Sequence, residues 1–107
     1  MEDLHAKFLP QFVVLARKRL ALALTAAIAR DHSATSKVVR ELHTLAGEAG
    51  LLGLHEVVPL ARECEHKAKA LHASHSDADA DLLVGGLRQL EGVIERIGAT
   101  APKAGNS

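Results

Sequence analysis

The sequence is poor in aromatic residues and carries no excess charge of either sign. Its 107 residues include two phenylalanines but no tryptophan or tyrosine, although 48% of the chain is hydrophobic. A core must therefore be built from leucine, alanine, valine and isoleucine, which suits packed helices. Thirteen lysines and arginines balance thirteen aspartates and glutamates. Because binding to a nucleic-acid backbone requires a basic stripe, we do not expect a nucleic-acid partner.

The sequence also lacks a cysteine pair and a long apolar segment, which bears on its cellular compartment and on membrane insertion. Cys64 is the only cysteine, which excludes an internal disulfide. The N-terminus lacks the pattern of a cleaved signal, and the apolar stretch over residues 20–28 is too short to span a bilayer. We therefore expect a cytoplasmic protein without a membrane segment. The length suits one domain, expected over residues 1–98, followed by a disordered tail over 99–107.

Apolar residues recur at three-and-four spacing, which predicts an all-α fold. The expected helices cover about 4–30, 36–52, 55–72 and 77–97, with a loop at 73–77 and a stop at Gly98. Pro10 is expected to break the first, leaving a short N-terminal helical extension. Short loops and one apolar stripe per helix predict an antiparallel up-down four-helix bundle. The expected stripes are Phe8, Phe12, Leu15, Leu22 and Ala26; Val38, Leu42, Leu45, Ala49 and Leu52; Val57, Ala61, Cys64, Ala68 and Leu71; and Leu83, Leu87, Leu90, Ile94 and Ile97.

His43 is expected to point away from the core stripe of the second helix, because successive residues turn by about 100°. Its neighbours one and two turns on are Ala46, Gly47 and Gly50, all of them small. Two glycines inside a helix sacrifice roughly 2 kcal/mol of helix propensity, so stability does not account for them. A bare face beside a nucleophilic imidazole favours a site that another protein approaches closely. The alternative is that the glycines let a neighbouring helix pack.

Residues 41–54, ELHTLAGEAGLLGL, resemble the motif of histidine-containing phosphotransfer (HPt) domains, in which H-x-L/I-K-G precedes small residues and another glycine. The matching residues are His43, Leu45, Gly47, Ala49 and Gly53. The resemblance covers about residues 4–97, because the family also places this motif on the second long helix of a four-helix bundle. It implies a phosphorelay carrier whose phosphoacceptor is His43, with Gly47 shaping the surface around it.

The resemblance also implies partners and cofactors. The expected partners are a response-regulator receiver domain, a hybrid sensor histidine kinase, or both, and the chain is not expected to be a kinase by itself. No metal or nucleotide of its own is expected, because the receiver supplies the Mg²⁺ that neutralises the transferring charge. A self-contained bundle favours a monomer.

Two positions depart from the motif. The family's lysine three residues after the histidine is Ala46 here, and Glu48 replaces the usual small residue after the glycine. Loss of a charge-assisted hydrogen bond would lower the transfer rate by roughly 10- to 100-fold, less at an exposed site. Arg40, one turn before His43, is the candidate for a partial substitute cation; the alternative is that it is an ordinary solvated charge.

Two other functions remain open. The first is a docking module of the same fold that binds a receiver or kinase without carrying phosphate. The second is a kinase dimerisation segment, which four helices in one chain disfavour because such a segment needs a second copy. A metal site at Cys64, His66, His72 and His75 is disfavoured by their spacing, and Glu48, Glu63 and Glu65 are expected to be solvated surface residues.

Overall fold

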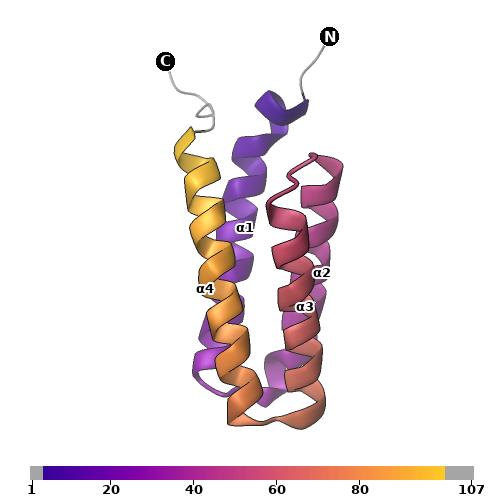
Figure 1. The fold of residues 1–107 in the computed structure, drawn as a ribbon, viewed down its shortest axis with the longest axis vertical. Helices are drawn as coiled ribbons and strands as arrows, with labels where there is room; N and C mark the ends of the chain where they lie inside the picture. The colour runs from indigo at the N-terminus through magenta and orange to yellow at the C-terminus, as the bar shows by residue number, and fades with distance from the viewer. Residues whose placement is uncertain (1–3, 101–107) are drawn as a thin grey trace.

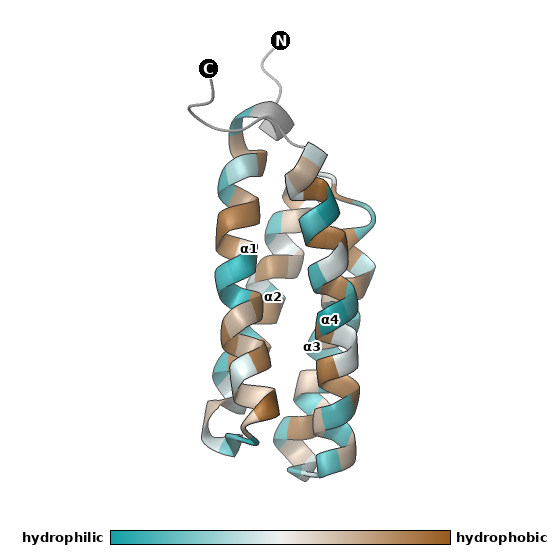
Figure 2. Ribbon diagram, turned by 90° about the vertical axis from the view of Figure 1, so that its left-hand side faces the viewer, coloured by the Kyte–Doolittle hydropathy of each residue, from teal (hydrophilic) through white to brown (hydrophobic). Residues whose placement is uncertain are grey.

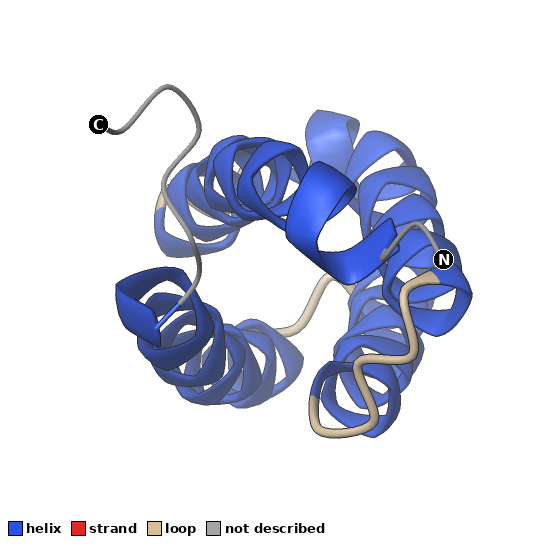
Figure 3. Ribbon diagram, turned by 90° about the horizontal axis from the view of Figure 1, so that it is seen from above, coloured by secondary structure: helices blue, strands red, loops and turns tan. Residues whose placement is uncertain are grey.

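The structure, a computed structural model, describes residues 4–100 as four α-helices and one short 3₁₀ helix, with side chains described from residue 7 onward. The elements are α1 (Leu4–Ile28), η1 (His32–Ala34), α2 (Thr35–Leu51), α3 (Val57–Ser74) and α4 (Asp77–Thr100). Consecutive helices run in opposite directions, and α4 returns to pack against α1, so the four close into a ring (Figures 1 and 3). The predicted all-α antiparallel bundle is confirmed. Among the described helices, none has both the length and the apolarity needed to cross a membrane.

Helix α1 continues through Pro10, so the predicted break and the separate N-terminal extension are wrong. A proline removes one backbone hydrogen bond and crowds the carbonyl four residues earlier, and a bend can relieve that crowding without ending the helix. Seen from above, the first turns of α1 lean over the end of the bundle (Figure 3). Leu9 and Phe12, on either side of the proline, are buried there. Their packing offsets the lost hydrogen bond.

The predicted core stripes hold for three helices and fail for the first. In α2, α3 and α4 the expected residues are buried, apart from Leu52 and Ile97, which are partly buried at the helix ends. In α1, however, Phe8 and Leu15 are exposed. Apolar residues of α1 also lie outside its core face, for example the exposed Val14 and Leu15, so its period does not single out one face. Along α4, by contrast, polar and apolar bands alternate visibly (Figure 2). The core residues of α1 are Leu9, Phe12, Val13, Ala16, Leu20, Ala23, Leu24 and Ala27.

The helix ends differ by a few residues from the expected ones. Helix α3 continues to Ser74 and ends at His75, whose φ of 56° is left-handed, so the expected loop at 73–77 shortens to two residues. Ser76 Oγ then accepts a hydrogen bond from the Asp79 backbone N–H at 3.0 Å and caps α4. The disordered tail predicted from residue 99 is wrong for residues 99 and 100, which are helical, and its remainder lies outside the described residues.

Gly98 does not stop α4, contrary to the prediction. A Cβ at this position would come within 3.1 Å of both Arg17 Nη2 and Val13 Cγ1. The glycine therefore lets α4 approach α1 closely. Arg17 also donates two hydrogen bonds to Glu95 at 2.7 and 2.9 Å, and this contact lowers the pKa of the Glu95 carboxyl. Both contacts hold the first and last helices together.

Candidate functional site

His43 lies on the outer side of α2, where 74% of its side chain is exposed. Its Nδ1 is 3.0 Å from Oε2 of Glu65 on α3. A carboxylate at this position accepts a hydrogen bond, so the contact places the proton of a neutral imidazole on Nδ1. The lone pair of the nucleophile is then on Nε2. The two helices together present an oriented, accessible imidazole.

Glu65 was expected to be a solvated surface residue, and that expectation is wrong. Only 12% of its side chain is exposed, and besides His43 it contacts Lys69, whose Nζ lies 3.4 Å from Oε2. Glu65 is therefore held between a histidine and a lysine. Nothing in the local sequence signals this role, because His43 and Glu65 lie 22 residues apart on different helices. Of the other two glutamates, Glu63 is an exposed partner of Lys67.

The bare face beside His43 consists of Gly47 and Gly50, which are exposed. A Cβ added at either glycine would meet nothing within 4 Å in the described part of the chain. Ala46 does not belong to this face, although the sequence placed it there. It is 3% exposed and lies in the core. Because α2 packs against both α1 and α3, its buried arc is wider than one stripe and includes Ala46.

Two charged residues of α2 have different surroundings. Glu48, the acidic departure from the motif, receives a hydrogen bond from Arg19 Nη1 of α1 at 2.8 Å. Its charge is therefore offset on the side of α2 that faces α1. Arg40 is exposed and makes no ion pair with any residue between 7 and 100. Its charge stays available to solvent, and its role as the substitute cation stays a prediction.

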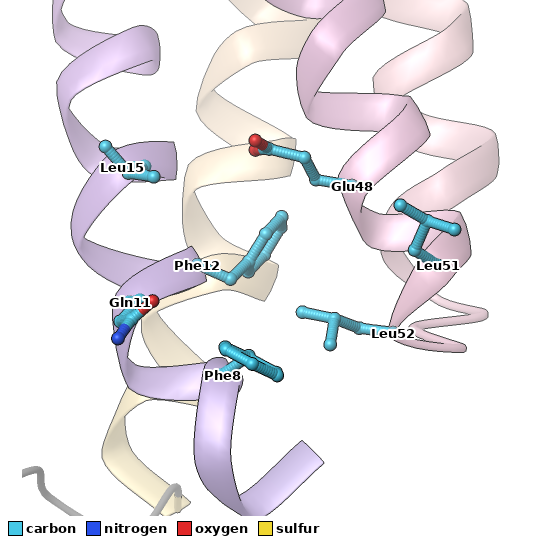
Figure 4. A pocket seen from close by; sticks show the side chains of 7 residues that line it. All are labelled: Phe8, Gln11, Phe12, Leu15, Glu48, Leu51 and Leu52. Carbon is cyan, nitrogen blue, oxygen red and sulfur yellow. The ribbon is translucent and has the colours of Figure 1, made fainter. Parts of the chain in front are cut away.

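An apolar groove, here called the end groove, opens between the start of α1 and the end of α2. Its volume is about 370 Å³. Figure 4 shows the rings of Phe8 and Phe12 extending from α1 into the groove, with Leu52, the residue just after α2, on the opposite side. Leu51, at its rim, is 86% exposed. The lining residues are Phe8, Gln11, Phe12, Leu15, Glu48, Leu51 and Leu52.

A second groove, here called the His43 groove, lies between His43 and α3. Its volume is about 330 Å³. It is polar, in contrast to the end groove, since every residue around it is charged or a histidine. The lining residues are His43, Arg62, Glu65, His66 and Lys69. Their side chains surround the solvent-exposed imidazole on the α3 side.

The sequence spacing of Cys64, His66, His72 and His75 disfavoured a metal site at these residues. Among the described side chains, no three metal-ligating groups converge on one point. Cys64 is buried, and burial raises the pKa of its thiol to about 11. His72 Nδ1 lies 2.6 Å from Thr35 Oγ1, and the ring of His75 stacks on that of His32 with centroids 4.5 Å apart. His72 therefore contacts Thr35, whereas His75 and His32 contact each other.

A family model described as the Hpt domain matches residues 7–100, a span that includes His43, Glu65 and nearly all of the four helices. The chain belongs to the Hpt domain family. This match confirms the resemblance read from residues 41–54. Hpt domains are phosphotransfer modules of two-component signalling, and their typical partners are receiver domains and histidine kinases. Searches among curated proteins and among solved structures found no match for the chain.

Proposed function

We propose that this Hpt domain carries a phosphoryl group on Nε2 of His43 and exchanges it with the aspartate of a receiver domain or takes it from a histidine kinase. The observation that carries the proposal is the 3.0 Å contact between His43 Nδ1 and Glu65 on an imidazole that is 74% exposed. A fixed tautomer makes Nε2 the nucleophile, and exposure lets a second protein reach it. The role implies a cytoplasmic monomer.

The transfer step follows from this arrangement. The Nε2 lone pair attacks the phosphorus of an aspartyl phosphate, the bond from phosphorus to the aspartate oxygen breaks, and the carboxylate leaves with the electron pair. The imidazole ring, now bonded to phosphorus and still holding the Nδ1 proton, gains positive charge. Glu65 stabilises that charge, as a carboxylate does for an imidazolium. The reverse step returns the phosphoryl group to a receiver. We expect no cofactor on this chain, because the Mg²⁺ that offsets phosphoryl charge is the receiver's.

Two surfaces support close docking of the partner. Gly47 and Gly50 leave the helix backbone uncovered next to His43. Leu51, at the rim of the end groove, lies eight residues after His43, about 12 Å along the helix axis. We propose that the receiver covers both, so that an apolar contact positions its aspartate over Nε2. A Leu51→Glu variant should bind receivers at least about 10-fold more weakly, while its chemical phosphorylation by a small donor stays unchanged.

The direct test is chemical phosphorylation of the purified protein with phosphoramidate, followed by mass spectrometry under alkaline conditions. We expect one phosphoryl group on His43, which a receiver domain with Mg²⁺ then removes. A His43→Gln variant should take up none, with an unchanged melting temperature, because the side chain is exposed. Phosphorylation elsewhere, or a phosphohistidine that no receiver accepts despite binding, would contradict the carrier function.

Glu65→Gln tests the orienting contact. It removes the charge that stabilises the imidazolium, so we expect phosphorylation by phosphoramidate to slow by about 10-fold. Glu63→Gln is the matched control, since Glu63 lies two residues away in an exposed pair with Lys67. It should change the rate by less than 2-fold. Equal rates for both variants would show that the charge of Glu65 does not stabilise the imidazolium.

A second candidate function is a docking module of the same fold that binds a receiver without carrying phosphate. The absence of the motif lysine favours it, because Ala46 is buried and supplies no charge. In that case His43→Gln would keep both receiver affinity and signalling output. The carrier function instead requires that output be lost while affinity persists.

A further inference from the structure

The His43 groove is built from one face of α3. Its α3 residues are Arg62, Glu65, His66 and Lys69, whose spacing of three, one and three residues places them on a single side of the helix. Two of the four, Arg62 and Lys69, are basic. The phosphoacceptor therefore lies beside a cationic wall that belongs to a different helix from its own.

The two basic residues of this wall differ in whether their charge is already paired with a carboxylate. Glu65 bridges His43 at 3.0 Å and Lys69 at 3.4 Å, so the lysine charge is shared with a carboxylate. Arg62 makes no ion pair or hydrogen bond through its side chain within residues 7–100. Its guanidinium is thus the unpaired permanent charge on the groove. Arg40 is also unpaired in the described chain, but it does not line the groove.

The position of the motif lysine provides no such charge. Ala46 is buried in the core at 3% exposure, so the position of the motif lysine itself presents no cation toward a phosphoryl group. A guanidinium offers several N–H donors in a planar fork that matches phosphate oxygens, and an ammonium adds a compact charge. Arg62 supplies the guanidinium and Lys69 the ammonium. Both lie on the α3 side of His43, where Glu65 already holds the imidazole.

We propose that Arg62 and Lys69 of α3 bind the oxygens of the phosphoryl group on His43 and do the work of the absent motif lysine. The inference rests on the proposed carrier function and names the residues that stabilise the charged group. Lys69 also offsets the charge of Glu65, which would otherwise repel the phosphoryl oxygens. The cations that bind the phosphoryl group therefore lie on α3, which orients His43, and not on α2, which carries it.

The reaction with phosphoramidate isolates this effect because it needs no protein partner. Nε2 of His43 attacks phosphorus, the bond from phosphorus to the amide nitrogen breaks, and that nitrogen leaves as ammonia with its electron pair and a proton from solvent. Arg62 and Lys69 then face the three phosphoryl oxygens. The measured quantity is the rate at which phosphohistidine forms at a fixed donor concentration.

The test compares Arg62→Gln, Lys69→Gln and the double variant with Arg40→Gln. Arg40→Gln tests the competing candidate cation, because it removes the same charge one turn from His43 on α2. We expect about a 10-fold loss of rate for Arg62→Gln, a larger loss for the double variant, and less than 2-fold for Arg40→Gln. Arg62→Lys should recover most of the rate. Phosphorylation of the parent protein should slow with added salt, and Arg62→Gln should lose most of that dependence.

Two outcomes would overturn the inference. If Arg40→Gln slows phosphorylation as much as Arg62→Gln, the cation belongs to α2. If the double variant keeps the parent rate with unchanged helix content and melting temperature, the cationic wall does not contact the phosphoryl group. Both results leave the carrier function standing, since His43 is still phosphorylated in the parent protein. The carrier function itself fails on different results, namely a parent protein that takes up no phosphoryl group on His43 or a phosphohistidine that no receiver accepts despite binding.

Discussion

Two helix faces in this bundle carry glycines that nothing covers, and they differ in what stands beside them. Gly47 and Gly50 on α2 and Gly85 and Gly92 on α4 all lack a neighbour within 4 Å of a built Cβ in the described chain. Only on α2 do the glycines adjoin a histidine. Bare glycines therefore do not identify a site by themselves. The decisive feature is the contact from α3 that orients His43 beside them.

Adjacent glycines of α4 show a third environment. Gly85 is uncovered, whereas a Cβ at Gly86 would lie 3.2 Å from Cys64 Sγ and 3.3 Å from Lys67 Nζ. The second glycine therefore lets α4 approach α3. The same residue type leaves an open surface on α2 and allows close packing on α4. From the sequence alone, each of these glycines indicates only a lower helix propensity.

The largest expected difference between the α2 and α4 faces concerns transfer to a receiver. Gly47→Gln adds a long neutral side chain where the partner backbone must approach His43, so we expect transfer to slow by about 100-fold. Gly85→Gln adds the same side chain on α4 and should leave transfer within 2-fold. Both transfer rates can be measured by mixing each phosphorylated variant with one receiver and stopping the reaction at successive times. Equal rates would show that the α2 face is not the docking face.

The next effect is on stability and separates the two adjacent glycines of α4. Gly86→Leu forces a large side chain against buried Cys64, and we expect it to lower the free energy of unfolding by about 1–3 kcal/mol. Gly85→Leu meets open space and should not destabilise the fold. Urea unfolding followed by circular dichroism gives both values. A Gly86→Leu variant as stable as the parent would mean that α3 and α4 are less closely packed here.

A smaller effect should be common to the two bare faces. Gly47→Ala and Gly85→Ala each remove backbone freedom from the unfolded chain without a clash, so each should raise the free energy of unfolding by about 0.5–1 kcal/mol. Urea unfolding compares them directly. A clear loss of stability at Gly47 alone would contradict the open space found above it. Equal gains with unequal transfer rates would separate stability from function.

A further effect on stability appears at alkaline pH and concerns Cys64, behind the α4 face. Burial raises the pKa of its thiol from 9.0 to about 11, so the folded protein holds this proton more tightly than the unfolded chain. The resulting stability is complete below pH 9 and is lost as the pH rises through about 11. Cys64→Ala should remove this part of the decline. Parallel urea titrations at pH 8 and 11 measure it, and identical pH dependence in both proteins would contradict it.

Much of the fold could be predicted from the sequence, but not all of it. The regular spacing of Leu83, Leu87 and Leu90 identifies the inward face of α4, because the opposite face is polar. Helix α1 has no comparable contrast, so the prediction that Phe8 and Leu15 face the core failed. Pro10 was misjudged for a related reason: a local penalty was weighed without the tertiary packing of its neighbours that offsets it.

The candidate site divides in the same way. The exposure of His43 and of its two neighbouring glycines follows from their positions on one helix, which the sequence specifies locally. The burial of Ala46 does not, because it depends on how far α1 and α3 wrap around α2. The role of Glu65 was missed altogether, since no local pattern joins it to a histidine 22 residues away.

By itself, the sequence determined the number and order of the helices, the inward faces of three of them, and a histidine on a bare outer face. These features depend on hydrophobic periodicity and on residues within two turns of each other. Only the tertiary structure decided which side chains meet that histidine. The rotation of α3 about its own axis and its register against α2 bring Glu65 into contact with His43 and place Arg62 and Lys69 on the same groove. Packing of the whole core fixes both, because a side chain can reach across helices only where the backbones place it.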